Sequence, residues 1–392
     1  MKNAGKSLSL LSTLEKFLDD VYKFYHYSPL NWTGLQETGD ALGIKVVRPV
    51  NIYGTRWAGH RHRALQALNT DYVAIHTHCT QVSINSKGDS ASKAKHILDC
   101  LQSLELVLFM HMMLFYFAVC ALLSDTFQDN DTSIDLIPVR MHAACVKLTE
   151  TNFDKMAEEF MSELQDGQYR TVTLEKKKRG SSTEATVIKR VKTEMRALSQ
   201  NTAEALYSRI AEFEGNSGVM EAFSIFTPVS WPENRSEFGT FGREEINKIT
   251  EHFSEYLRAK NITRESCMNE MPDVLMEAAD LFKKNPDCSY IDLWSKVLKQ
   301  DKMYNRYNNI LALVKISLVL AVSSAECERG FSMMSRVKTD WRSRLKPLTL
   351  SQLMTVAQCK TPLEDFDPRG AIARWMTGGK GPRRWTPAYG TD

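Results

Sequence analysis

The first apolar residues of the chain are spaced as in a helix. Residues 8–25 read LSLLSTLEKFLDDVYKFY, and their apolar positions recur at the three- and four-residue intervals that place side chains on one helix face. That face consists of Leu11, Leu14, Phe17, Leu18, Val21 and Phe24. A Pro/Asn/Gly stretch follows, and IKVVRPV at 44–50 predicts a short strand. Pro49 confines such a strand to a sheet edge or a strand end.

The remaining pattern is mostly helical. It turns helical at Thr55 and stays so to about residue 165, whereas 166–187 predict an exposed loop. Further helices are expected at 188–214, 242–259, 270–284 and 289–299. The last structured part is expected at 303–361, and the Gly/Pro/Arg-rich sequence after residue 367 predicts a disordered tail.

One apolar run raises the question of a membrane. Leu106–Leu123 spans 18 residues without a formal charge, the lower limit for a membrane-crossing helix. His111 lies in its middle, and no basic flank orients it. The run also continues a helical pattern that begins at Ser90, the expected N-cap. We therefore favour a buried central helix over a membrane span, and we expect no membrane partner.

Composition points to an intracellular protein without naming a ligand. The net charge of +3 over 392 residues is too small to indicate nucleic-acid binding by itself. The eight cysteines stand far apart, and no CxxC occurs. Acidic residues occupy the N-terminal stretch where a signal peptide needs apolar ones. We therefore expect an intracellular protein whose thiols are reduced. KKKR at 176–179 is either a nuclear-localisation signal or a solvated loop. We expect the protein in the nucleus, and in the cytoplasm as a further location.

The sequence HTHC is the strongest candidate for a zinc site. It offers His76, His78 and Cys79, with His60 or His62 as a fourth ligand. Structural zinc sites normally use pairs spaced as CxxC or HxxxH. On a helix, His76 and His78 point about 200° apart. We therefore expect no metal site here.

The C-terminal part contains a pattern of two capped helices joined by a basic connector. Ser323 with Glu326 forms one S-x-x-E capping box, and Thr349 with Gln352 forms a second one just after Pro347. The second helix carries an apolar stripe of Leu350, Leu353, Met354 and Ala357. The connector holds Arg336, Lys338, Arg342, Arg344 and Lys346. From pattern alone, this is equally a packed helix pair with a solvated basic turn.

Two blocks of the sequence resemble a known superfamily. SSAECERGFS at 323–332, followed by R-x-L, resembles the S-x-x-x-ERxFS block in the C-terminal dimerisation domain of hAT-superfamily transposases. GTRWAGHRHRALQAL at 54–68 is similar to the TRW block of the same superfamily. The resemblance extends over residues 1–361 and is greatest to domesticated, hAT-transposase-like zinc-finger proteins.

The resemblance implies a mostly α fold, with a partial RNase H-like core interrupted by a large all-α insertion domain. On that basis we expect a core remnant of one helix and one strand at 1–54. The insertion domain would follow at 55–302, the dimerisation region at 303–361 and a disordered tail at 362–392.

The resemblance also implies where chemistry would lie. Complete members hold two Mg²⁺ or Mn²⁺ ions with two aspartates and a glutamate, which must converge on the reacting oxygens. Glu328 occupies the position of the third carboxylate. The family's aspartates and a CxxH motif precede the TRW block, yet only 54 residues precede Thr55 and no CxxH occurs. The aspartates Asp19, Asp20 and Asp40 lie on a helix or in a turn. We therefore expect a vestigial Glu328, no enzyme and no cofactor, with Mg²⁺ relevant only to a complete transposase.

Trp57 matches the family tryptophan that stacks on a DNA base extruded near the transposon end. Any base offers a flat face to an indole. Without the resemblance, Trp57 reads as a half-buried packing residue. DNA is therefore a second partner to consider, bound by Arg56, Trp57 and His60.

We expect a non-catalytic, transposase-derived protein that forms homodimers or higher oligomers through its C-terminal region. The predicted contact residues are Phe331, Met334, Leu350, Leu353, Met354 and Ala357. The alternatives are a nucleic-acid-binding regulator and the C-terminal fragment of a larger DDE-type hAT transposase.

Overall fold

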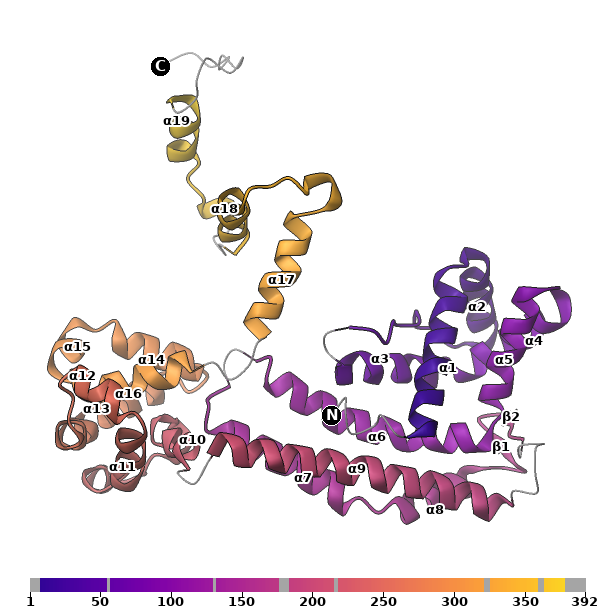
Figure 1. The fold of residues 1–392 in the computed structure, drawn as a ribbon, viewed down its shortest axis with the longest axis horizontal. Coiled ribbons are helices and arrows are strands. Elements are labelled where there is room, and N and C mark those ends of the chain that lie inside the picture. Colours follow the sequence, from indigo (N-terminus) through magenta and orange to yellow (C-terminus); the bar gives the residue numbers. More distant parts are fainter. Residues whose placement is uncertain are drawn as a thin grey trace. The chain divides into compact units, whose positions relative to one another are not determined.

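The chain is built almost entirely of helices, in two compact units. The computed structural model describes residues 8–54, 57–129, 132–175, 183–214, 218–320, 325–358 and 363–377. Unit 1 comprises residues 1–323 and unit 2 comprises residues 324–392 (Figure 1). The prediction of a mostly α fold is confirmed.

The first two helices show what the apolar pattern revealed and what it missed. Helix α1 spans Ser9–His26, and all six residues of its predicted stripe are buried, as expected. Helix α2 spans Pro29–Leu42, where the sequence predicted a loop. The Ser28 side chain accepts a hydrogen bond from the Asn31 N–H, Pro29 takes the first helical position and Gly43 ends the helix at φ 67°. These are the residue types that start and stop helices.

The strand predicted at 44–50 is wrong. These residues form neither helix nor strand, and the Val47 N–H donates to both carboxylate oxygens of Asp71 at 3.0 Å rather than to a neighbouring strand. Within the described residues, the strands are β1 (Gln168–Tyr169) and β2 (Val172–Thr173), which pair as an antiparallel hairpin. The hairpin lies inside the predicted loop at 166–187.

The helical stretch predicted from Thr55 to about residue 165 is present as separate helices. They are α3 (Trp57–Thr70), α4 (Tyr72–Asn85), α5 (Asp89–Leu101), α6 (Leu104–Thr126), α7 (Leu136–Glu150) and α8 (Phe153–Glu163). The predicted continuous helix from Ser90 is wrong, because α5 begins at Asp89 after Gly88 and ends at Leu101. Ser103 then starts α6, and its side chain accepts a hydrogen bond from the Leu106 N–H.

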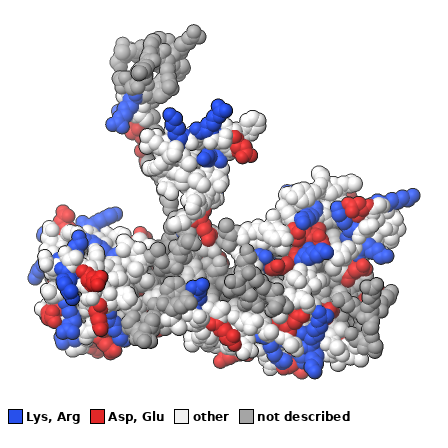
Figure 2. Space-filling model, viewed as in Figure 1, with Lys and Arg blue, Asp and Glu red and all other residues white. Residues whose placement is uncertain are grey.

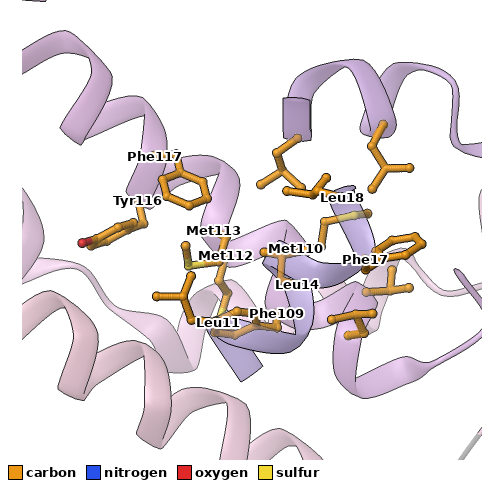
Figure 3. Packing of buried hydrophobic residues seen from close by; sticks show 14 of the residues in the cluster. Leu11, Leu14, Phe17, Leu18, Phe109, Met110, Met112, Met113, Tyr116 and Phe117 are labelled. Atoms are coloured by element: carbon orange, nitrogen blue, oxygen red, sulfur yellow. The ribbon is translucent and has the colours of Figure 1, made fainter. Parts of the chain in front are cut away.

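Helix α6 lies in the larger hydrophobic core of unit 1. That core also takes in α1, α3, α4 and α5, and the long helix α9 (Glu184–Glu214) packs against α6 and α7. Figure 3 shows Leu11 and Leu14 of α1 together with Phe109, Met110 and Met113 of α6. By length and composition α6 could cross a membrane, but 72% of its most apolar window is buried inside the protein. This burial agrees with the core-helix interpretation.

A second core of unit 1 forms from residues 219–320 and Ile134. Its α-helices are α10 (Val219–Ala222), α11 (Arg243–His252), α12 (Ser254–Ala259), α13 (Arg264–Lys284), α14 (Tyr290–Leu298), α15 (Asp301–Arg306) and α16 (Asn308–Val319). Three 3₁₀ turns, η1 (Phe223–Phe226), η2 (Pro228–Ser230) and η3 (Arg235–Gly239), precede α11. Trp294 is fully buried, and its indole N–H donates to the Phe226 carbonyl at 2.9 Å. Neither core divides at the predicted domain boundaries of 54/55 and 302/303.

Unit 2 is a helical hairpin with a further helix. It contains α17 (Ala325–Val337), η4 (Asp340–Arg342), α18 (Pro347–Gln358), η5 (Leu363–Asp365) and α19 (Arg369–Thr377). The capping box predicted at Thr349 is wrong, because α18 already begins at Pro347, a residue suited to the first helical position. Helix α19 also corrects the predicted tail over 369–377. Ser323 and the Glu326 side chain lie outside what the structure describes.

Candidate functional site

The hairpin of α17 and α18 has no hydrophobic core of its own. The two helices pack against each other, yet no described side chain between Cys327 and Arg374 is buried. A stable fold normally requires an apolar face to be covered by another layer of structure. The hairpin alone does not provide that cover.

Exposed apolar side chains occur on both helices. On α17, Phe331 is 64% exposed, while Met333 and Met334 are half-buried. On α18, Leu348 and Val356 are each 71% exposed. Exposed apolar side chains that form a patch mark interaction sites, whereas single scattered ones are ordinary.

The predicted contact residues divide into two groups in the structure. Met334, Leu350 and Met354 are half-buried, whereas Phe331, Leu353 and Ala357 are exposed. Two further exposed residues, Leu348 and Val356, were missed, the first because the predicted helix began at Thr349 and the second because it lies off the predicted stripe. Starting the helix at Pro347 brings Leu348 into its first turn. The accessible apolar surface of α18 is therefore wider than the sequence predicted.

Glu328 lies half-buried on α17. No hydrogen bond or ion pair joins its carboxylate to another described residue. In unit 1, Asp19 pairs with Lys23 at 2.6 Å, Asp20 lies 3.4 Å from His96, and Asp40 is exposed on α2. Over the described ranges, no group of three His, Cys, Asp or Glu side chains could hold a metal ion.

Trp57 is engaged in packing. Its ring and that of Phe117 form a T-shaped pair with a centroid distance of 5.6 Å, and the Arg61 guanidinium lies 4.7 Å from the Trp57 ring centroid. His60, also predicted to bind nucleic acid, packs against Gly54. A Cβ added to Gly54 would come within 2.3 Å of the His60 ring. Arg56 lies outside the described residues, as does KKKR at 176–179. Packing thus accounts for the positions of Trp57 and His60.

The residues of HTHC have separate partners. His76 Nε2 lies 3.2 Å from the Gln102 amide nitrogen, and His78 Nδ1 lies 3.1 Å from the Tyr25 hydroxyl. Burial lowers the pKa of both histidines and raises the pKa of the Cys79 thiol to about 12. No disulfide joins the described cysteines. Burial at this position favours neutral side chains.

In a comparison with known protein families, the C-terminal helices match one family model. Residues 271–358 match the model of the hAT family C-terminal dimerisation region. The match begins within α13 and ends at the last residue of α18, so it starts before the boundary predicted at residue 303. No solved structure matches the chain.

Proposed function

We propose that the chain is a transposase-derived protein of the hAT family and that it works as a non-catalytic homodimer or higher oligomer, because residues 271–358 match the C-terminal dimerisation region of that family. The exposed apolar side chains of α17 and α18 form the contact. A second copy of the same chain is the partner, since the region named for dimerisation includes both helices.

The observation that carries this proposal is the absence of any buried side chain from the described part of the hairpin, together with its exposed apolar residues. Fully covering a leucine or valine side chain contributes about 1.5–3 kcal/mol. In a two-fold dimer each residue counts twice, because both subunits use the same surface. Covering Leu348 and Val356 therefore provides a substantial part of the association energy.

The charges around this surface fit the same proposal. Interfaces between subunits are apolar at the centre and polar at the rim, with arginine enriched. Arg342 and Arg344 are exposed in the connector next to α18. Arginine side chains in that position would surround the apolar contact and remain hydrated.

The absence of catalysis is part of the proposal. It is supported by the engagement of Asp19 with Lys23 and of Asp20 with His96, and by the lack of a metal-binding group of three His, Cys, Asp or Glu side chains among the described residues of either unit. A partial RNase H-like core, the nuclear location and the absence of a cofactor stay predictions. No contact in the structure favours DNA binding at Trp57, so the regulator alternative is not developed at that residue.

Co-purification of two differently tagged copies tests the proposal. Wild-type copies should be recovered together, and Leu348→Glu with Val356→Glu in both copies should abolish this, because four carboxylates would enter the contact. The matched control is Val229→Glu, which replaces a 94% exposed apolar side chain in unit 1. Undiminished recovery of the double variant, with unchanged circular dichroism, would refute the proposed surface.

A further inference from the structure

The connector between α17 and α18 exposes an indole to water. Trp341 is 98% exposed, the highest fraction for a large apolar side chain in the described ranges. It lies in the single turn η4, held by hydrogen bonds from the Arg342 N–H to the Thr339 carbonyl and from the Leu345 N–H to the Arg342 carbonyl. No described ring or cation stacks on the indole. The backbone thus presents an unpartnered aromatic face on a fixed turn.

Cations surround this indole along the chain. Residues 336–346, RVKTDWRSRLK, contain five basic side chains and one acidic one, a net charge of 5 − 1 = +4 in 11 residues. All five basic side chains are exposed, and none forms an ion pair with a described residue. Figure 2 shows Lys and Arg side chains gathered on this part of unit 2. Among the described residues these cations have no acidic partner, whereas the surface residue Arg235 pairs with Asp280.

We propose that residues 336–346 form a binding site for single-stranded nucleic acid, in which Trp341 stacks on a base and the flanking cations contact phosphates. Single strands are bound by this combination, since every base offers a flat face and each phosphate a negative charge. A duplex fits less well because its bases are already stacked on each other. An acidic peptide would use the cations but would leave the indole without a role.

The site is distinct from the apolar centre of the proposed self-association surface and shares with it only the rim arginines, Arg342 and Arg344. It uses Trp341 and the connector cations, whereas the self-association surface uses apolar side chains on α17 and α18. In a homodimer the site would occur twice, so one strand could contact both copies. The site is also distinct from Trp57, whose ring already contacts Phe117 and Arg61.

Fluorescence anisotropy with the full chain tests the site, using labelled oligothymidylate and oligouridylate to distinguish DNA from RNA. Trp341→Ala should weaken binding about 5- to 150-fold, the equivalent of losing one stacked base, and Trp341→Phe should retain most of the affinity. Arg342→Ala with Arg344→Ala should reduce the slope of log affinity against log salt by about 1.4, at about 0.7 for each phosphate contact.

Matched controls come from unit 1. Tyr256 is 51% exposed, and Lys296 and Lys299 are exposed on or just after α14. Tyr256→Ala, and Lys296→Ala with Lys299→Ala, should leave both the affinity and the salt slope unchanged. A general effect of charge or of aromatic content would appear in these variants as well.

Four outcomes would overturn the proposal. The first is absence of binding to either oligonucleotide, and the second is unchanged affinity in Trp341→Ala. The third is that polyglutamate displaces the oligonucleotide equally well from wild type and from Trp341→Ala, which would assign the connector to acidic peptides. The fourth is a monomeric Trp341→Ala protein in light scattering, which would assign the indole to the subunit contact.

Discussion

Asp71 provides a test of how unit 1 holds the segment before α3. Its carboxylate has no exposed surface, and its two oxygens accept only from the Val47 N–H among the hydrogen bonds of the described structure. Burial raises its pKa from 3.8 to about 6, partly offset by that hydrogen bond. A buried carboxylate with one donor prefers its neutral form.

The sign of the effect follows from the direction of this shift. Because the pKa is higher in the folded state, the folded protein binds more protons than the unfolded chain between about pH 4 and pH 6. The stabilisation that protonated Asp71 provides is therefore complete below pH 3.8 and is lost as the pH rises through about 6. A shift of roughly 2 pKa units corresponds to about 3 kcal/mol.

The assay is urea unfolding of wild type and Asp71→Asn at a series of pH values from 4 to 7.5, an interval of roughly 2 units around the shifted pKa. All other titrating groups are common to both proteins, so the difference between their unfolding free energies isolates residue 71. The variant should gain about 2.5 kcal/mol relative to wild type between the two ends of the series, because a small part of the effect is already lost at pH 4. A difference that stays constant with pH would refute the reasoning about Asp71.

Further predictions concern the core, the chemistry and the location of the protein. Phe109→Asp should unfold the protein, since an unpaired buried carboxylate costs about 3–5 kcal/mol, whereas Leu122→Asp on the exposed side of the same helix should remain folded in circular dichroism. The chain should show no nuclease or strand-transfer activity with Mg²⁺ or Mn²⁺, and nicking that disappears in Glu328→Gln would contradict this. The protein should be absent from carbonate-washed membrane pellets, because α6 is largely buried; retention there would support a membrane span.

Apolar periodicity predicted the fold where one helix face meets a core. The stripe of α1 is the clearest case, since its positions follow the helix period without interruption. Helix α2 was missed although Ser28, Pro29 and Gly43 carry its start and stop signals, because its apolar pattern is weak and only a few of its side chains are buried. Capping residues alone predict a boundary and need a periodic pattern to predict a helix.

Tertiary contacts decided what local pattern could not. Residues 44–50 have strand-like composition, but the Val47 N–H bonds to Asp71, which is remote in sequence. The break between α5 and α6 falls at Gln102 and Ser103, inside an otherwise continuous helical pattern. There the Glu175 N–H donates to the Gln102 carbonyl and the Leu104 N–H to the Glu175 carbonyl, a connection that depends on a distant segment.

The sequence predicted where the candidate site lies in the chain, but it predicted less well which of its side chains are exposed. The ERGFS block pointed to the C-terminal helices, which the family comparison supports. Burial then separated residues that the stripe had grouped, and it showed Trp341 to be exposed and Trp57 to be packed. Sequence gives an indole its position along the chain, but only the surrounding structure determines whether its ring is accessible.

The central claim is that the hairpin of α17 and α18 joins two copies of the chain. Light scattering after size exclusion measures this directly, because the chain mass is 44.7 kDa. Wild type and Val229→Glu should have twice that mass or a higher multiple, and Leu348→Glu with Val356→Glu should have the mass of one chain while keeping its helical circular dichroism. A wild-type protein of 44.7 kDa at all concentrations, or a folded double variant that keeps the wild-type mass, would contradict the account.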